Sequence, residues 1–317
     1  MTKKKKLTFK GIKEILGNTV KGLGEDRVIK LSGSLAYSTV FAMGPLMIVI
    51  ISLCGIFLGA ESAQGKVYEV LKGFVGQDTA AQLQEIIRNA SLSGKSTWAA
   101  VIGGVALLIG ATSVFAEIQD SINQIWGLKS KPKKGWVKFL KDRFLSFSVI
   151  VSLGFLLLVS LAITGIVEAI SNRLQARFPD VTVALFYVVN LLLTLGISML
   201  IFAVIFKVLP DANIRWKDVR AGALVTAVLF MLGKFAISLY VSQAKVGSTY
   251  GAAGSLVVLL VWIYYSSIIL FLGAEFTKAW AVLYGEPIHP SQFAVTVRQV
   301  EVEEGKKTVQ EKERSKQ

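Results

Sequence analysis

The chain alternates between long stretches without charged residues and short segments that hold most of its lysine and arginine. A helix needs roughly 20 apolar residues to cross the hydrocarbon core of a bilayer. Runs of this length without a charge are Leu31 to Ala60, Ser96 to Ala116, Phe144 to Val167, Val181 to Phe206 and Val246 to Ala274. A further run, 221–244, is interrupted only by Lys234. The pattern predicts an all-α integral membrane protein whose membrane domain, 31–285, has six transmembrane helices at about 31–60, 96–120, 144–168, 181–207, 219–244 and 251–279.

The amino-acid composition supports this fold class and excludes several kinds of functional site. Of 317 residues, 53% are hydrophobic and 18% are charged, against about 25% charged in a typical soluble protein. These values exclude a disordered chain and most soluble enzymes. The single cysteine, Cys54, and the single histidine, His289, exclude an internal disulfide and a Cys/His metal site. Without a phosphate-binding loop or a hydrolase motif, we expect no enzymatic activity, no cofactor and no metal.

The distribution of the basic residues predicts the orientation of the chain. Lysine and arginine number nine in 1–30, seven in 117–143, four in 207–220 and seven from 275 onward. The alternate segments, 61–95, 168–180 and Lys245, hold four, two and one. Cytoplasmic loops carry the excess of positive charge, so both termini are expected in the cytoplasm. Anionic headgroups of the inner leaflet then account for the net charge of +14 without a specific nucleic acid partner.

Three segments outside the spans have distinct patterns. Segment 1–30 is basic, and it places Phe9, Ile12, Leu16, Val20 and Leu23 on one helical face, which predicts an amphipathic helix lying on the membrane surface. The external loop 61–95 repeats a helical spacing of apolar residues, which predicts two short helices over the outer mouth of the bundle. The tail 286–317 is charged and poor in large apolar residues, so we expect it to be disordered.

Polar residues close to the inner ends of the spans are candidates for a functional site. Glu117, Asp120 and Asn123 end the second span, and Glu275 ends the sixth, with Arg143, Lys207 and Arg220 at the same level. One interpretation is an ion-pair network at the membrane interface. The alternative is a cytoplasmic gate or a proton site.

Lys234 differs because its position is near the middle of a span. It follows Arg220 by 14 residues, or roughly 21 Å of helix. Pro45 follows Leu31 by the same number of residues, and a proline inside a helix frees a backbone carbonyl that needs a partner. We hypothesise that Lys234 faces the break at Pro45 or a cavity beside it, where its amine binds those carbonyls or an anionic headgroup. The alternative is a lysine that extends along its own helix toward the interface.

Three blocks of sequence resemble the YihY/BrkB family of bacterial inner-membrane proteins. The first is Gly33-Ser-Leu-Ala-Tyr37 with Pro45, and the second is Glu117-Ile-Gln-Asp-Ser-Ile-Asn-Gln-Ile-Trp126-Gly127. The third includes Leu209-Pro210-Asp211, Trp216, Gly222-Ala223, Gly233-Lys234, Tyr240, Tyr250-Gly251, Trp262-Ile-Tyr264 and Gly273-Ala274-Glu275. Together the blocks extend over most of the membrane domain. The resemblance implies a six-span protein of the bacterial cytoplasmic (inner) membrane.

The family was formerly labelled ribonuclease BN, and this sequence argues against that activity. RNA hydrolysis needs clustered metal ligands or paired acid and base groups, and a single histidine supplies neither. We therefore expect a transporter or translocator of an amphipathic or anionic molecule, with lipid as one candidate. Its candidate substrate or gating residues are Pro45, Lys234, Glu117, Asp120, Asn123 and Glu275, and its expected partners are membrane lipids. The alternative function is a membrane scaffold or envelope-assembly factor without transport. A ribonuclease is the least favoured of the three functions. The sequence indicates no oligomeric state.

Overall fold

The computed structural model is predominantly helical. It describes residues 8–58, 65, 68, 84, 97–130, 140, 143–152, 154–156, 159, 179–244, 254–292 and 294–297. The helices are α1 (Phe9–Glu25), α2 (Val28–Leu58), α5 (Thr97–Ile125), α7 (Pro179–Val208), α8 (Trp216–Ala244) and α10 (Gly254–Tyr284). Further helical residues occur between 143 and 159. Most of the predicted external loop 61–95 lies outside the described residues, as does the outer part of the predicted third span.

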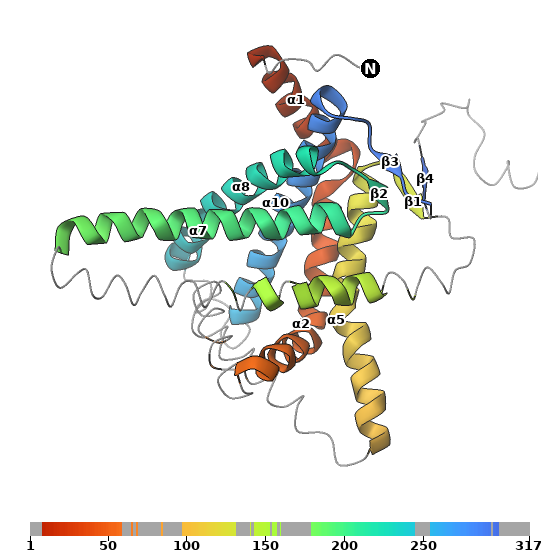
Figure 1. Ribbon diagram of the computed structural model, residues 1–317, viewed down its shortest axis with the longest axis vertical. Helices are drawn as coiled ribbons and strands as arrows, with labels where there is room; N and C mark the ends of the chain where they lie inside the picture. Colours follow the sequence, from red (N-terminus) through yellow and green to blue (C-terminus); the bar gives the residue numbers. More distant parts are fainter. Residues whose placement is uncertain are drawn as a thin grey trace, which may run out of the picture.

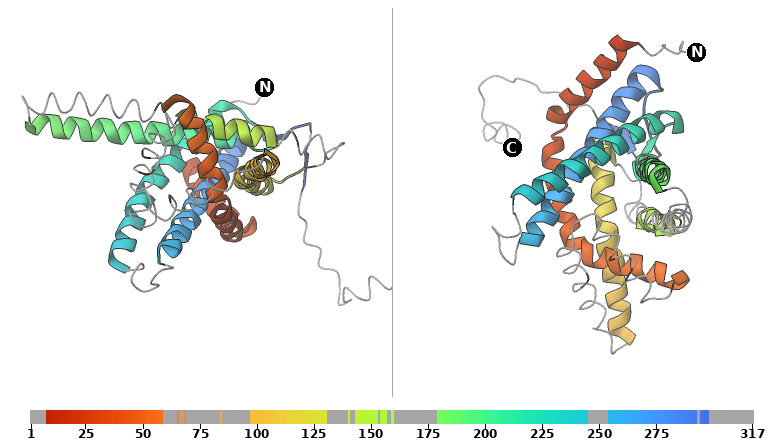
Figure 2. Two further views of the ribbon diagram at one scale, coloured as in Figure 1. Left: turned by 90° about the horizontal axis from the view of Figure 1, so that it is seen from below. Right: turned by 90° about the vertical axis from the view of Figure 1, so that its left-hand side faces the viewer.

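Helices therefore occur within the ranges expected for the membrane spans, but they do not all run along one axis. Figure 1 shows α7 crossing the pair formed by α2 and α5, and the right-hand view of Figure 2 shows α7 end-on while α5 runs vertically in the plane of the page. Among the described residues, three helical segments are long and apolar enough to cross a membrane: Val188–Val208, Trp216–Ile237 and Val257–Tyr284. The predicted total of six spans and the orientation of the termini stay predictions.

Helix α2 changes direction partway along its length, as both views of Figure 2 show. The helix contains one proline, Pro45. Sharp bends in helices are almost always found at proline or a few other identifiable features. The break that the sequence predicts at Pro45 itself stays a prediction.

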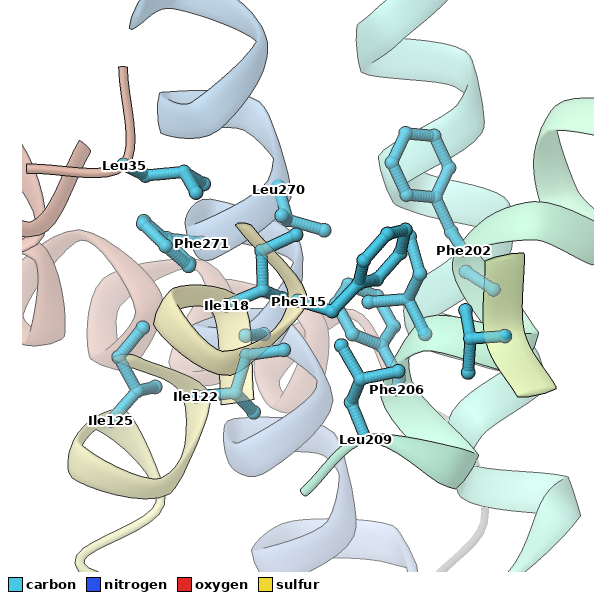
Figure 3. Close-up of a cluster of buried hydrophobic side chains, with 14 of the residues drawn as sticks. Leu35, Phe115, Ile118, Ile122, Ile125, Phe202, Phe206, Leu209, Leu270 and Phe271 are labelled. Carbon is cyan, nitrogen blue, oxygen red and sulfur yellow. The ribbon is translucent and has the colours of Figure 1, made fainter. Parts of the chain in front are cut away.

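The main hydrophobic core lies where α2, α5, α7 and α10 meet (Figure 3). Phe115, Ile118, Ile122 and Ile125 from α5 face Phe202 and Phe206 from α7, with Leu35, Leu270 and Phe271 beside them. The residues from α5 recur at intervals of three or four, which keeps them on one side of the helix. The core holds together segments that are up to 246 residues apart in sequence, from Val28 to Ala274.

Helix α10 is the central element, and small residues allow α8 to approach it closely. A Cβ atom added at Gly222 would lie 1.7 Å from the Thr277 hydroxyl oxygen, and one added at Gly273 would lie 1.9 Å from the Thr226 hydroxyl oxygen. Each threonine donates a 2.7 Å hydrogen bond to the carbonyl of a glycine in its own helix, Thr226 to Gly222 and Thr277 to Gly273. The two helices thus contact one another through a reciprocal pair of glycines and threonines.

Helix α1, and after it the start of α2, pack against another side of α10. Gly11, Gly22 and Gly33 lie opposite Tyr284, Glu275 and Tyr264, respectively. The glycines are eleven residues apart, and the second interval includes the turn between α1 and α2. The line of contact therefore continues from α1 into α2, across the turn at Asp26 and Arg27.

In the part of the chain that the structure describes, four short strands close the end at which α5, α7 and α10 finish. β1 (Leu128–Ser130) pairs with β4 (Ala294–Thr296), and β2 (Ala212–Asn213) pairs with β3 (His289–Pro290), both antiparallel. The prediction of a disordered tail was wrong for 286–297 as far as these residues are described, because backbone pairing with the loops after α5 and α7 compensates for their lack of large apolar side chains. Residues 298–317 lie outside the described residues.

Candidate functional site

The candidate residues do not form one site. Their contacts among the described residues place Glu117, Asn123 and Glu275 in three separate groups. Lys234 lies on α8, away from these contacts. The side chain of Pro45 is outside the described side chains, so the predicted approach of Lys234 to Pro45 stays a prediction.

Glu117 and Asp120 lie on the last turns of α5. Ser34 in α2 donates a 2.6 Å hydrogen bond from its hydroxyl to Glu117 Oε1. Asp120 is exposed. Glu117 thus joins α5 to α2 through the Ser34 hydroxyl group, and the ion-pair network that its basic neighbours suggest stays a prediction.

Asn123 is part of a buried polar network with Asp211. Its amide nitrogen donates to Asp211 Oδ2 over 3.1 Å, and its amide oxygen accepts from the Asp211 backbone N–H over 2.8 Å. The Ser130 hydroxyl donates to the same carboxylate oxygen over 2.9 Å, and the Ser291 backbone N–H donates to the Asp211 carbonyl over 2.9 Å. The network joins the end of α5, β1, the bend after α7 and the chain after α10, so its evident role is structural.

Glu275 occupies a buried position between α10 and the end of α1. The residue is 2% exposed, and its Oε1 atom has no hydrogen-bond partner among the described residues. Its other oxygen, Oε2, lies 3.5 Å from Lys278 Nζ, and the same ammonium lies 2.6 Å from Asp26 Oδ2. Both carboxyl groups therefore contact the same ammonium group. Two carboxyl groups and one ammonium thus share one small volume.

Gly22 explains why the Glu275 carboxyl can occupy this position. A Cβ atom on Gly22 would lie 2.5 Å from Glu275 Oε2 and 2.9 Å from Oε1. Only a residue without a side chain leaves room for the carboxyl group between α1 and α10. The end of α5 lies in the same region. The Trp126 indole N–H donates a 3.1 Å hydrogen bond to the carbonyl of Ala274, the residue before Glu275.

Lys234 is half-buried within the candidate span Trp216–Ile237. The residue before it, Gly233, lies against the Tyr265 ring of α10, where an added Cβ would come within 1.8 Å of the hydroxyl. The residue after it, Phe235, is exposed. Lys234 therefore lies at the edge of the α8–α10 contact, between a closely packed side and an apolar exposed side.

Helix α1 has three faces with different properties. Gly11, Ile15, Thr19 and Gly22 are buried. Beside them, an apolar stripe formed by Phe9, Ile12, Leu16 and Val20 is exposed, with Phe9 at 86% and Val20 at 66%. The remaining face carries Lys10, Lys13, Glu14 and Lys21. The predicted amphipathic helix is thus present, except that Leu23 packs against the main core.

Sequence reasoning missed three residues of these sites. Asp26 and Lys278 entered only the charge totals, and Asp211 appeared only in the family resemblance. Asp26 directly follows α1, and Lys278 is one turn after Glu275 on α10. Spacing within α10 could have paired Lys278 with Glu275, but no local signal places Asp26 beside a residue 249 positions later.

Comparisons with known proteins identify similar membrane proteins. A family model described as virulence factor BrkB matches residues 19–289. A UPF0761 membrane protein of Pseudoalteromonas translucida is 28% identical over 260 residues, which cover 80% of this chain and 81% of that protein. One of Vibrio parahaemolyticus is 29% identical over 86% of this chain and 82% of its own, and one of Vibrio atlanticus is 30% identical over 80% and 78%. No solved structure matches.

Proposed function

Because the chain belongs to the BrkB virulence factor family of membrane proteins, we propose that it is a multi-pass protein of the bacterial cytoplasmic membrane that translocates an amphipathic or anionic molecule. The candidate substrate class is a lipid with an anionic headgroup. Its direct partners are then the lipids of the bilayer, and the protein is not an enzyme.

The observation that carries this proposal is the position of Lys234. A charged residue inside a membrane span is costly and marks a substrate or ion pathway by default. Lys234 lies 18 residues after the start of α8, or roughly 27 Å along the helix, and so is far from its first turn. Its half-buried position, with apolar side chains exposed next to it, suits a site where an anionic headgroup meets the protein while the acyl chains remain in lipid.

The surfaces around Lys234 support a lipid rather than a water-soluble substrate. Leu224, Val228, Leu232 and Phe235 follow a helical spacing of three or four on α8, and all are exposed. An apolar exposed stripe of this kind is compatible with acyl chains. A lipid bound at Lys234 would have its tails along this stripe.

Replacing Lys234 with alanine is expected to slow lipid scrambling severalfold, because the cation that meets the headgroup is lost. The measurement uses the purified full-length protein in liposomes that contain fluorescent anionic phospholipid, with a membrane-impermeant reductant added outside. Lys217→Ala is the matched control, because Lys217 is an exposed lysine in the first turn of the same helix. This variant should scramble lipid at the wild-type rate. Equal rates for wild type and Lys234→Ala, or no scrambling by either, would contradict the proposal and favour the scaffold function.

The apolar stripe of α1 is expected to lie in the inner leaflet of the membrane. In a Cys54→Ser background, a nitroxide attached at Leu16→Cys should collide more often with oxygen, which concentrates in lipid, than with a water-soluble nickel chelate. A nitroxide at Glu14→Cys, on the charged face of the same helix, should show the opposite preference. Electron paramagnetic resonance with both relaxants measures the ratio. If both positions prefer the nickel chelate, the helix does not lie on the membrane.

A further inference from the structure

We propose that Asp26, Glu275 and Lys278 form a proton-binding site at the junction of α1 and α10, in which the two carboxyl groups share one proton. The proposal goes beyond the translocation function and does not depend on it. The site is distinct from Lys234, which lies on α8.

The contacts within the cluster leave one hydrogen bond to be made. Lys278 donates to Asp26 Oδ2 over 2.6 Å and lies 3.5 Å from Glu275 Oε2. Glu275 Oε1 is buried and has no partner among the described residues. A carboxylate oxygen can only accept hydrogen bonds, so two carboxyl groups held close together by one ammonium group are stabilised when one of them carries a proton. The proton supplies the missing donor.

The net charge of the cluster formed by Asp26, Glu275 and Lys278 agrees with the binding of one proton. With both carboxyl groups ionised, the cluster carries two negative charges and one positive charge. Among the described residues, Lys278 forms the ion pair with Glu275, and Asp26 shares the same ammonium group. The Gln124 amide, from α5, donates over 3.4 Å to the Asp26 carbonyl and is neutral, and the pair of Lys21 with Glu25 lies on the exposed surface of α1. One bound proton makes the cluster neutral, and an unpaired buried charge is costly.

The site is built for a small ligand with a path to water. Gly22 packs directly against the Glu275 carboxyl, so the space around the two oxygens is small. Asp26 and Lys278 have side chains 24% and 35% exposed, while Glu275 is 2% exposed. A proton can therefore reach Glu275 through Asp26. The described residues contain no group of three or more metal-ligating side chains at this or another place, which favours a proton over a metal ion.

The proton also affects the packing of α1 on α10. Because Gly22 contacts the carboxyl and Asp26 directly follows α1, both carboxyl groups lie at the contact between the helices. Loss of the proton leaves one net negative charge in this contact. The docking of α1 is therefore coupled to occupancy of the site.

Infrared difference spectroscopy of the full-length protein can detect the proton directly. In a maltoside detergent without carbonyl groups, the wild type at pH 7 should show the C=O stretching band of a protonated carboxyl group, which shifts in D2O. The band should be absent in Glu275→Gln, which keeps the shape of the protonated side chain. It should also be absent in Asp26→Asn, because the remaining Glu275 and Lys278 are neutral together without a proton.

The control variant is Glu117→Gln, which replaces a carboxyl group bound by Ser34 outside the cluster and should keep the band. A wild type without the band would overturn the proposal, whatever the variants show. A band that persists in Glu275→Gln would assign the proton elsewhere, and one that persists in Asp26→Asn would overturn the sharing between the two carboxyl groups. Circular dichroism and gel filtration verify that each variant is folded.

Discussion

Replacing Gly222 with alanine is expected to destabilise the protein by about 1–3 kcal/mol, the usual cost of inserting a methyl group into a closely packed contact. The new Cβ would lie 1.7 Å from the Thr277 hydroxyl oxygen and 2.9 Å from the Thr277 Cβ atom. Thr277 cannot rotate away freely, because its hydroxyl is buried and donates to the Gly273 carbonyl. Either α8 moves away from α10, or this hydrogen bond is lost. Thermal unfolding in detergent should show the change as a fall of several degrees in the apparent melting temperature.

A glycine without close neighbours serves as the control. Gly196 in α7 has no atom within 4 Å of an added Cβ, and alanine is favoured over glycine in a helix by about 1 kcal/mol. Gly196→Ala should therefore leave the melting temperature unchanged or raise it. If Gly222→Ala behaves in the same way as Gly196→Ala, the close contact between α8 and α10 is not present in the protein.

Replacing Asp211 with alanine is expected to cost about 2–3 kcal/mol, because hydrogen bonds to a charged group are stronger than neutral ones and their loss leaves buried donors without partners. The Asn123 amide is buried and loses its acceptor, as does the Ser130 hydroxyl. The same unfolding measurement should detect the loss. Limited proteolysis should show faster cleavage within 286–297, since β3 and β4 pair with the strands on either side of this network.

Two further variants distinguish the hydrogen bonds from other effects at the site. Asp211→Asn keeps the shape and one acceptor oxygen, so it should recover part of the stability. Asn213→Ala removes only an exposed hydrogen bond of 3.4 Å from the Asn213 amide to the Pro290 carbonyl and should have little effect. Wild-type stability and proteolysis of Asp211→Ala would show that the network does not hold the loops together.

The sequence predicts the helical class and the family of this protein well. The charge-free runs predict helices where α2, α5, α7, α8 and α10 are found, because apolar composition is a property of the segment itself. The resemblance that begins at Gly33 and Pro45 is confirmed by the family match over 19–289. The apolar stripe of α1 could also be predicted, since Phe9, Ile12, Leu16 and Val20 lie on one face by spacing alone.

The sites could be predicted only in part, because they depend on contacts between distant segments. Depth along a helix placed Glu117, Asn123 and Glu275 at one level, and they nevertheless have different partners: Ser34, Asp211 and Lys278. Counting residues gives the position of a side chain along its own helix. It does not give which side chains of the neighbouring helices point toward it. The strands β3 and β4 were missed for a related reason, since pairing with β2 and β1 is a long-range property.

Gly11 and Gly22 of α1 and Gly33 of α2 contact α10 at evenly spaced positions, and this spacing has a consequence for movement of α1. The turn at Asp26 and Arg27 joins α1 and α2 without a long linker, so a displacement of α1 is passed on to the start of α2. Gly22 is midway between the other two contacts, and it is the one that touches a carboxyl group. A movement of α1 relative to α10 therefore changes the space around the Glu275 carboxyl group, which neither of the other two glycine contacts would do.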